Sequence, residues 1–126
     1  MSVATLPAEL VRAVAELEAA LPGRVKVYED QSGVVVAITG VTLSGRWTPR
    51  IGTLWFSIPY HYPDAAIYPF YVSGAQPTGG MIAGLQQVQW RGEAAIQVSL
   101  RHNAWNPKLD TALGSAVQAQ AWLTAH

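Results

Sequence analysis

The sequence predicts a single α+β domain that spans residues 1–126. Three observations predict this class: a helical pattern near the start, a series of short strands with tight turns, and a second helical pattern at the end. Helices that are segregated from an antiparallel sheet cover one of its faces. We therefore expect one core, between the helices and one face of the sheet.

The first helix is expected to begin near Thr5, whose hydroxyl can cap it, with Pro7 inside the first turn. Pro22-Gly23 ends the helical pattern. Between them, apolar residues recur at helical spacing and form one face, namely Leu10, Val14, Leu17 and Leu21.

Four strands are expected next, over residues 25–27, 34–39, 52–59 and 68–72. Because short turns join them, they should form an antiparallel meander. Alternation in the third strand predicts that Phe56 faces the core and Trp55 faces the other side of the sheet. Residues 73–84 hold four glycines and one proline and are expected to form an irregular flap.

The last part of the chain predicts two short extended pieces, residues 88–90 and 95–100, and then a long helix. Asn106 is the expected N-cap of this helix and Pro107 its first residue, and it should run almost to His126. Its apolar side is expected to consist of Leu109, Leu113, Val117 and Ala121.

The charge pattern argues against nucleic-acid and membrane partners. Eight basic residues balance eight acidic ones, and they form no basic cluster. No apolar run approaches the roughly 20 residues that a membrane span requires. The first residues lack the basic and apolar regions of a secretion signal, so a cytoplasmic location is expected. The alanine-rich composition is compatible with a bacterial source.

The chain contains no cysteine, which excludes disulfides, thiolate metal sites and a thiol nucleophile supplied by this chain. Its three histidines, His61, His102 and His126, show no metal-ligand spacing, and we expect no metal site. The glycines of the flap do not follow a strand into a helix, as a phosphate-binding loop would. No cofactor is therefore expected.

Three segments resemble the ubiquitin-conjugating enzyme family. Leu54-Trp-Phe-Ser-Ile58 followed by Tyr62-Pro63 and Tyr68-Pro69 resembles the strand that leads into the family's Tyr-Pro-x-x-x-Pro motif. Ile96-Gln-Val-Ser-Leu100 resembles the segment that carries the catalytic cysteine. Trp105-Asn-Pro-Lys-Leu109 resembles the family's Trp-x-Pro-x-Leu, which follows that cysteine by eight residues. The resemblance implies a leading helix, a four-stranded meander, an irregular flap and a long helix.

The departures from the family pattern imply a non-catalytic variant. Gln97 stands where the family has its nucleophile, and an amide cannot act as one. Gln89 lies where the family's His-Pro-Asn motif would place the asparagine. The chain also ends where the enzymes continue into two more helices. Non-catalytic members of the family bind ubiquitin or a partner conjugating enzyme, and RWD domains share the fold without the cysteine.

The resemblance therefore implies a protein partner: a ubiquitin-like protein, an activating enzyme or a catalytic conjugating enzyme. Two alternatives stay open. One is a transfer enzyme that forms an oxyester on Ser99 with His102 as general base, and the other is an RWD-like assembly module that forms a homodimer. Because Trp and Tyr commonly anchor protein interfaces, the expected binding residues are mainly aromatic. They are Trp47, Trp55, Tyr60, Tyr62 and Asn103.

Overall fold

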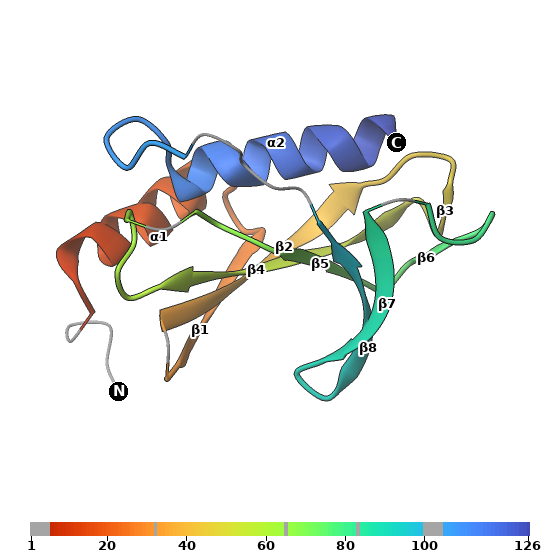
Figure 1. Ribbon diagram of the computed structural model, residues 1–126. Coiled ribbons are helices and arrows are strands. Elements are labelled where there is room, and N and C mark those ends of the chain that lie inside the picture. Colours follow the sequence, from red (N-terminus) through yellow and green to blue (C-terminus); the bar gives the residue numbers. More distant parts are fainter. Residues whose placement is uncertain (1–5, 32, 65, 83, 100–104) are drawn as a thin grey trace.

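The computed structural model describes residues 6–31, 33–64, 66–82, 84–99 and 105–126. Within these residues the chain forms an α+β domain with a helix near each end and an antiparallel sheet between them (Figure 1). The elements are α1 (Ala8–Ala20), β1 (Val25–Asp30), β2 (Gly33–Thr42), β3 (Trp47–Thr48), β4 (Ile51–Pro59), β5 (Phe70–Ser73), β6 (Gln76–Pro77), β7 (Leu85–Trp90), β8 (Glu93–Val98) and α2 (Ala112–Ala125).

The main sheet has six strands in the order β1-β2-β4-β5-β8-β7, where the sequence predicted four. The four expected strands are present as β1, β2, β4 and β5 and follow one another in antiparallel order. The two extended pieces near Arg91-Gly92 form the hairpin β7–β8, in which the first strand is longer than predicted and the second begins and ends two residues earlier. This hairpin joins the sheet because β8 pairs with β5, a long-range pairing that local patterns do not reveal.

The region expected to be an irregular flap also contains a short strand. Within it, β6 pairs with β3, so that Trp47 lies opposite Pro77 in a separate two-stranded sheet. The hydroxyl and the backbone N–H of Thr78 both donate to the carbonyl oxygen of Arg46. The flap is therefore fixed to the loop that precedes β4.

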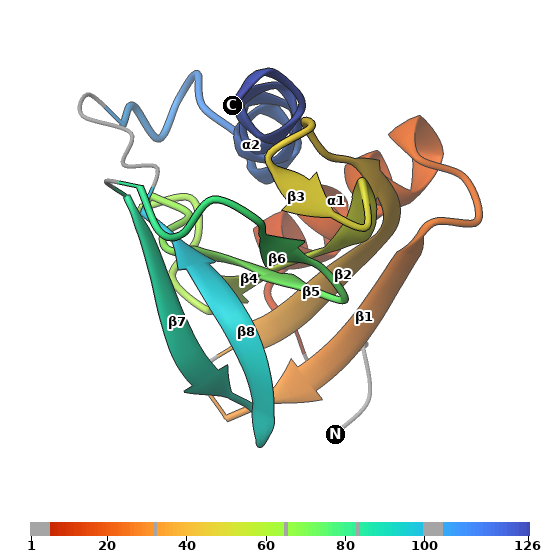
Figure 2. The same cartoon turned by 90° about the vertical axis from the view of Figure 1, so that its right-hand side faces the viewer.

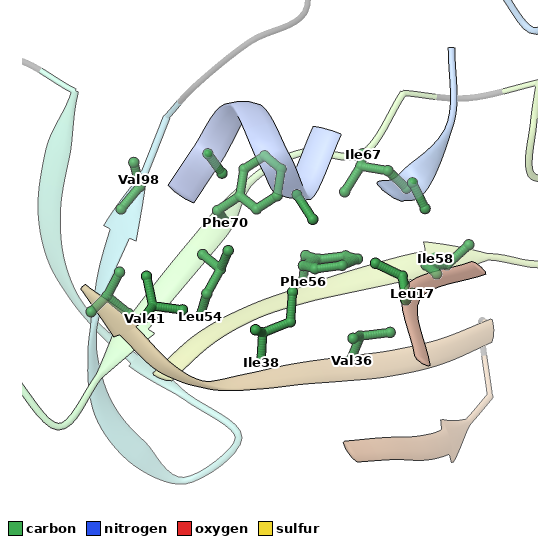
Figure 3. Close-up of a cluster of buried hydrophobic side chains, with 14 of the residues drawn as sticks. Leu17, Val36, Ile38, Val41, Leu54, Phe56, Ile58, Ile67, Phe70 and Val98 are labelled. Atoms are coloured by element: carbon green, nitrogen blue, oxygen red, sulfur yellow. The ribbon is translucent and has the colours of Figure 1, made fainter. Parts of the chain in front are cut away.

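Both helices lie on the same face of the main sheet, and the hairpin β7–β8 extends away from them (Figures 1 and 2). The core fills the space between this face and the helices (Figure 3). Phe56 points into it as predicted, is completely buried and packs edge-to-face on Phe70 at 5.6 Å between ring centroids. Neither helix has the length and apolar composition needed to cross a bilayer.

The first helix begins later than predicted, because α1 starts at Ala8 and Pro7 occupies the N-cap position. Pro7 has an extended backbone, with ψ at 146°, and makes no side-chain cap hydrogen bond. The predicted cap, Thr5, lies outside the described residues. The buried side of α1 is Leu10, Ala13 and Leu17, close to the predicted face.

The last helix also begins later than predicted, and it buries a different face. Asn106 and Pro107 start only a single turn, in which the backbone N–H of Asn106 donates to the carboxylate of Asp110 at 2.7 Å. Thr111 is the true N-cap, and its hydroxyl accepts from the N–H of Gly114. Most of the predicted face was wrong: Leu109 is 77% exposed and Val117 53% exposed, and of the four predicted residues Leu113 is the one that packs against the core. The buried face consists instead of Ala112, Ser115, Ala116, Ala119 and Leu123.

Candidate functional site: the aromatic side of the sheet

The face of the sheet opposite the helices carries a continuous row of side chains. The register places Trp55 of β4 between Ala37 of β2 and Tyr71 of β5, and Tyr71 next to Gln97 of β8. Alternation along each strand directs these side chains away from the core. Trp55 therefore lies on the side that the sequence predicted.

Four rings gather on this face, and we call Tyr28, Trp55, Tyr71 and Trp90 the aromatic cluster. Tyr28 stacks on Trp55 at 5.9 Å between ring centroids, and Trp55 meets the edge of Trp90 at 5.5 Å. Trp90 in turn stacks on Tyr71 at 4.3 Å. The rings come from β1, β4, β5 and β7, so the cluster joins both outer strands of the sheet to its centre. Offset and edge-on contacts of this kind restrict ring motion.

A hollow of about 240 Å³ opens beside the aromatic cluster. Its walls are the rings of Tyr28, Trp55 and Trp90 together with charged side chains at the tip of the hairpin β7–β8. The guanidinium of Arg91 lies 5.8 Å from the ring centroids of both Tyr28 and Trp90, within the range of cation–π attraction. Glu93 adds a carboxylate to the same rim. The hollow thus offers aromatic surfaces flanked by one positive and one negative charge.

Hydrogen bonding and burial fix the cluster further. The indole N–H of Trp55 donates to the hydroxyl oxygen of Ser73 at 2.8 Å, which orients the ring. Burial raises the pKa of the Tyr71 phenol above its ordinary value, with a smaller contribution from Tyr68. The raised pKa extends the range of basic pH over which Tyr71 keeps its hydroxyl proton as a hydrogen-bond donor.

The structure places the predicted site residues of the conjugating-enzyme pattern in different surroundings. Gln97 lies within β8, opposite Tyr71 on one side and Gln86 on the other, so it belongs to the interior of the sheet. Gln89 is exposed on β7. Ser99 is exposed just beyond β8, and its backbone N–H donates to the carbonyl of Gly84. His102 and Asn103 lie outside the described residues.

Two of the predicted binding aromatics are buried and need correction. Trp47 is 1% exposed because it packs in the core beneath the flap, so it cannot anchor a partner in this conformation. Tyr62 is 6% exposed, and its hydroxyl accepts a hydrogen bond from the N–H of Ala112 in the first turn of α2. Tyr60 is half-buried against the core. Of the predicted aromatic binding residues, Trp55 is the one that belongs to the aromatic cluster.

Trp105 and the Tyr62-Pro63 turn meet at the start of α2. The indole N–H of Trp105 donates to the carbonyl oxygen of Pro63 at 2.7 Å, and the rings of Trp105 and Tyr62 lie 6.5 Å apart. Together with the Tyr62–Ala112 hydrogen bond, this contact ties the Tyr-Pro turn to the segment that introduces the last helix. Trp105 and Pro63 are 42 residues apart in the sequence but in direct contact in the structure.

Sequence reasoning missed Tyr28, Trp90 and Arg91 as members of one site. Tyr28 is 41% exposed on an outer strand, and nothing local indicated a second aromatic beside it. The sequence signal for the hairpin was the glycine of Arg91-Gly92, a residue type that suits the positive φ of a two-residue hairpin turn, and in the structure φ is 51° at Arg91 and 81° at Gly92. Recognising that turn would have placed Trp90 and Glu93 opposite each other.

A second, larger hollow of about 420 Å³ lies between α1 and β1. Its lining is mainly apolar, with Val11, Val14 and Val27 beside the carboxylates of Glu18 and Glu29. Leu6, the first described residue, also lines it. The aromatic hollow is the better-defined candidate.

The described residues hold no group of three His, Asp or Glu side chains placed to bind a metal ion. Comparison of the chain with protein-family models, with curated proteins and with solved structures finds no match.

Proposed function

We propose that this chain is a catalytically inactive, ubiquitin-conjugating-like domain that binds a protein partner of a conjugation pathway in the cytoplasm. The partner is a ubiquitin-like protein, an activating enzyme or a catalytic conjugating enzyme. The observation that carries the proposal is the junction at Trp105, where the Trp105–Leu109 segment contacts the Tyr62-Pro63 turn, two of the three segments that resemble the family. A chance match of short motifs would not require them to meet.

The position of Gln97 supports binding over catalysis. It lies beside Tyr71 in a strand that is paired on both sides, so the side chain that would face a reacting carbon on the aromatic side of the sheet is an amide. An amide side chain has no lone pair basic enough to attack it, and the chain has no thiol at any position.

The aromatic cluster supplies a plausible contact surface for the partner. Tryptophan and tyrosine dominate the energetics of protein interfaces because each covers a large area with few rotatable bonds. Here the rings are already held by stacking and by the Trp55–Ser73 hydrogen bond. Little side-chain freedom would be lost on binding, which favours affinity.

Calorimetric titration with candidate ubiquitin-like proteins, activating enzymes and conjugating enzymes tests the proposal. We expect one class to bind, and Trp90→Ala to weaken that binding by about tenfold or more. Val117→Ala is the control, because it removes a 53% exposed apolar side chain from α2, on the other face of the sheet from the aromatic cluster. Circular dichroism and urea unfolding verify that each variant is folded.

The experiment tests the class of partner and the binding surface separately. If no class binds, the conjugation partner is excluded. If one binds with equal affinity to the unmodified chain and the Trp90→Ala variant, the partner is right but the surface is wrong.

A further inference from the structure

The strand β7 is an outer strand of the six-stranded sheet and pairs with β8 alone among the described strands. Figure 2 shows it at one margin of the molecule, with β8 on its inner side. The other outer strand is β1. An outer strand presents unpaired backbone groups to its surroundings, and proteins normally protect such groups.

The register shows which backbone groups of β7 face outward. In an antiparallel pair, alternate residues direct both backbone groups toward the neighbouring strand. The carbonyl of Gly84 accepts from Ser99 at 2.8 Å, and the tight turn pairs Trp90 with Glu93. Even-numbered residues of β7 therefore bond to β8, while Gln87 and Gln89 direct their N–H and C=O groups away from it.

The two outer strands differ in how they are protected. β1 carries Lys26 and Glu29, and charges of this kind discourage pairing with another strand. β7 has the sequence Leu-Gln-Gln-Val-Gln-Trp, with no charged residue and no proline. Its three glutamines are exposed. Only β7 lacks the usual features that block an additional strand.

We infer that β7 is a dimerisation strand that pairs antiparallel with β7 of a second copy of this chain. A two-fold axis at Val88 would set Gln87 opposite Gln89 of the partner subunit, and the reverse pair would form on the other side of the axis. Each pair exchanges two backbone hydrogen bonds. The two sheets would then become one continuous sheet.

The second copy fits because β7 is self-complementary. A two-fold axis brings each strand against its own sequence, so two like charges at positions 87 and 89 would face each other and repel. β7 carries none, and a glutamine amide can both donate to and accept from another glutamine. The two outward-facing residues, Gln87 and Gln89, are placed symmetrically about Val88. The dimer would also set both aromatic hollows on the same side of the joined sheet, which allows bivalent binding of a partner.

Sedimentation velocity over a concentration series tests the inference. We expect the unmodified chain to sediment at twice its 13.6 kDa mass as concentration rises. The double variant Gln87→Lys/Gln89→Lys places lysines opposite each other twice across the axis. It should raise the dissociation constant about tenfold or more.

The matched control is Gln87→Lys/Gln89→Glu, which changes the same two positions but sets a lysine opposite a glutamate twice. It should dimerise at least as well as the unmodified chain. Gln87→Pro removes one outward N–H without touching the bonds to β8, and it should also weaken the dimer. A monomer at all concentrations, or a dimer equally stable in both lysine-containing double variants, would overturn the inference.

Discussion

Gly33 is the first residue of β2 and pairs with Pro59, the last residue of β4. Its φ is 151°, and a Cβ built on it would collide with the backbone carbonyl of Ile58. A larger residue here would have both a strained backbone and this clash. Moving a side chain could relieve neither, because the obstructing atoms belong to the backbone of β4. The residue is required for the close approach of the two strands.

We expect Gly33→Ala to destabilise the fold by about 2–3 kcal/mol. Gly79→Ala is the matched control, because nothing lies within 4 Å of the Cβ position there. The midpoint of urea unfolding should fall for the first variant and stay unchanged for the second. Equal midpoints would show that β2 and β4 are farther apart than the structure has them.

The stability of the fold should depend on pH through Tyr62. Burial raises the pKa of its phenol above 10.0, despite the opposing hydrogen bond from Ala112. The folded chain therefore keeps this proton at pH values where the unfolded chain has lost it. The resulting stability is fully present below pH 10 and is lost as pH rises through the folded-state pKa.

Urea midpoints measured from roughly pH 9 to 11, on both sides of the ordinary tyrosine pKa, should therefore fall. Tyr62→Phe should make this fall shallower, while lowering stability at neutral pH by about 1 kcal/mol because the N–H of Ala112 loses its acceptor. Tyr28→Phe, at an exposed ring on β1, is the comparison. A slope that is identical in Tyr62→Phe and in the unmodified chain would contradict the assignment.

For the helices and strands, sequence patterns predicted the type of each element better than its first and last residues. The alternation of Leu54, Phe56 and Ile58 placed β4 and its core face correctly, since one side chain in two is buried there. The hairpin β7–β8 was underestimated because glutamines dominate β7 and hide the usual apolar signal. Its place in the sheet depends on the pairing of β8 with β5, which no local pattern specifies.

The last helix shows why apolar spacing can mislead. Larger residues marked one face, but the chain buries the alanines because small side chains let α2 approach α1 and β2 closely. Similarly, the candidate site was predicted only through Trp55. Tyr28 and Trp90 come from opposite edges of the sheet, and each contacts Trp55 between them.

Substitutions on the two faces of α2 test this correction. We expect Ala116→Leu to destabilise the fold by about 1–3 kcal/mol, because the larger side chain overpacks a fully buried position. Ala121→Leu makes the same change on the exposed face and should have little effect. Thermal unfolding of the two variants compares their losses of stability. A larger loss for Ala121→Leu would mean that the face predicted from the sequence is the buried one.

Across the whole molecule, Arg91 connects the two edges of the sheet. It sits at the tip of the hairpin β7–β8, yet its guanidinium lies over Tyr28 of β1, the strand at the opposite edge. The sheet therefore curls enough for its first and last strands to share a contact. This curl is what turns a flat row of side chains into a hollow.

A double-mutant cycle between Arg91→Asn and Tyr28→Leu measures the free energy of this contact between the two edges of the sheet. Asparagine tolerates the positive φ of Arg91, and the cycle cancels any remaining backbone effect. We expect a coupling free energy of about 0.5–1 kcal/mol from urea unfolding. Coupling near zero would mean that the edges do not meet in solution.

The buried indole of Trp47 gives the domain an internal reporter. The N–H groups of Trp55 and Trp105 have acceptors, but the indole nitrogen of Trp47 is buried with no acceptor among the described residues. Its proton can reach water only when the core between the flap and α2 opens. Of the five tryptophans, this one should therefore give an isolated indole signal in a nuclear magnetic resonance spectrum, and the exchange of that signal with deuterium would time the opening of the domain.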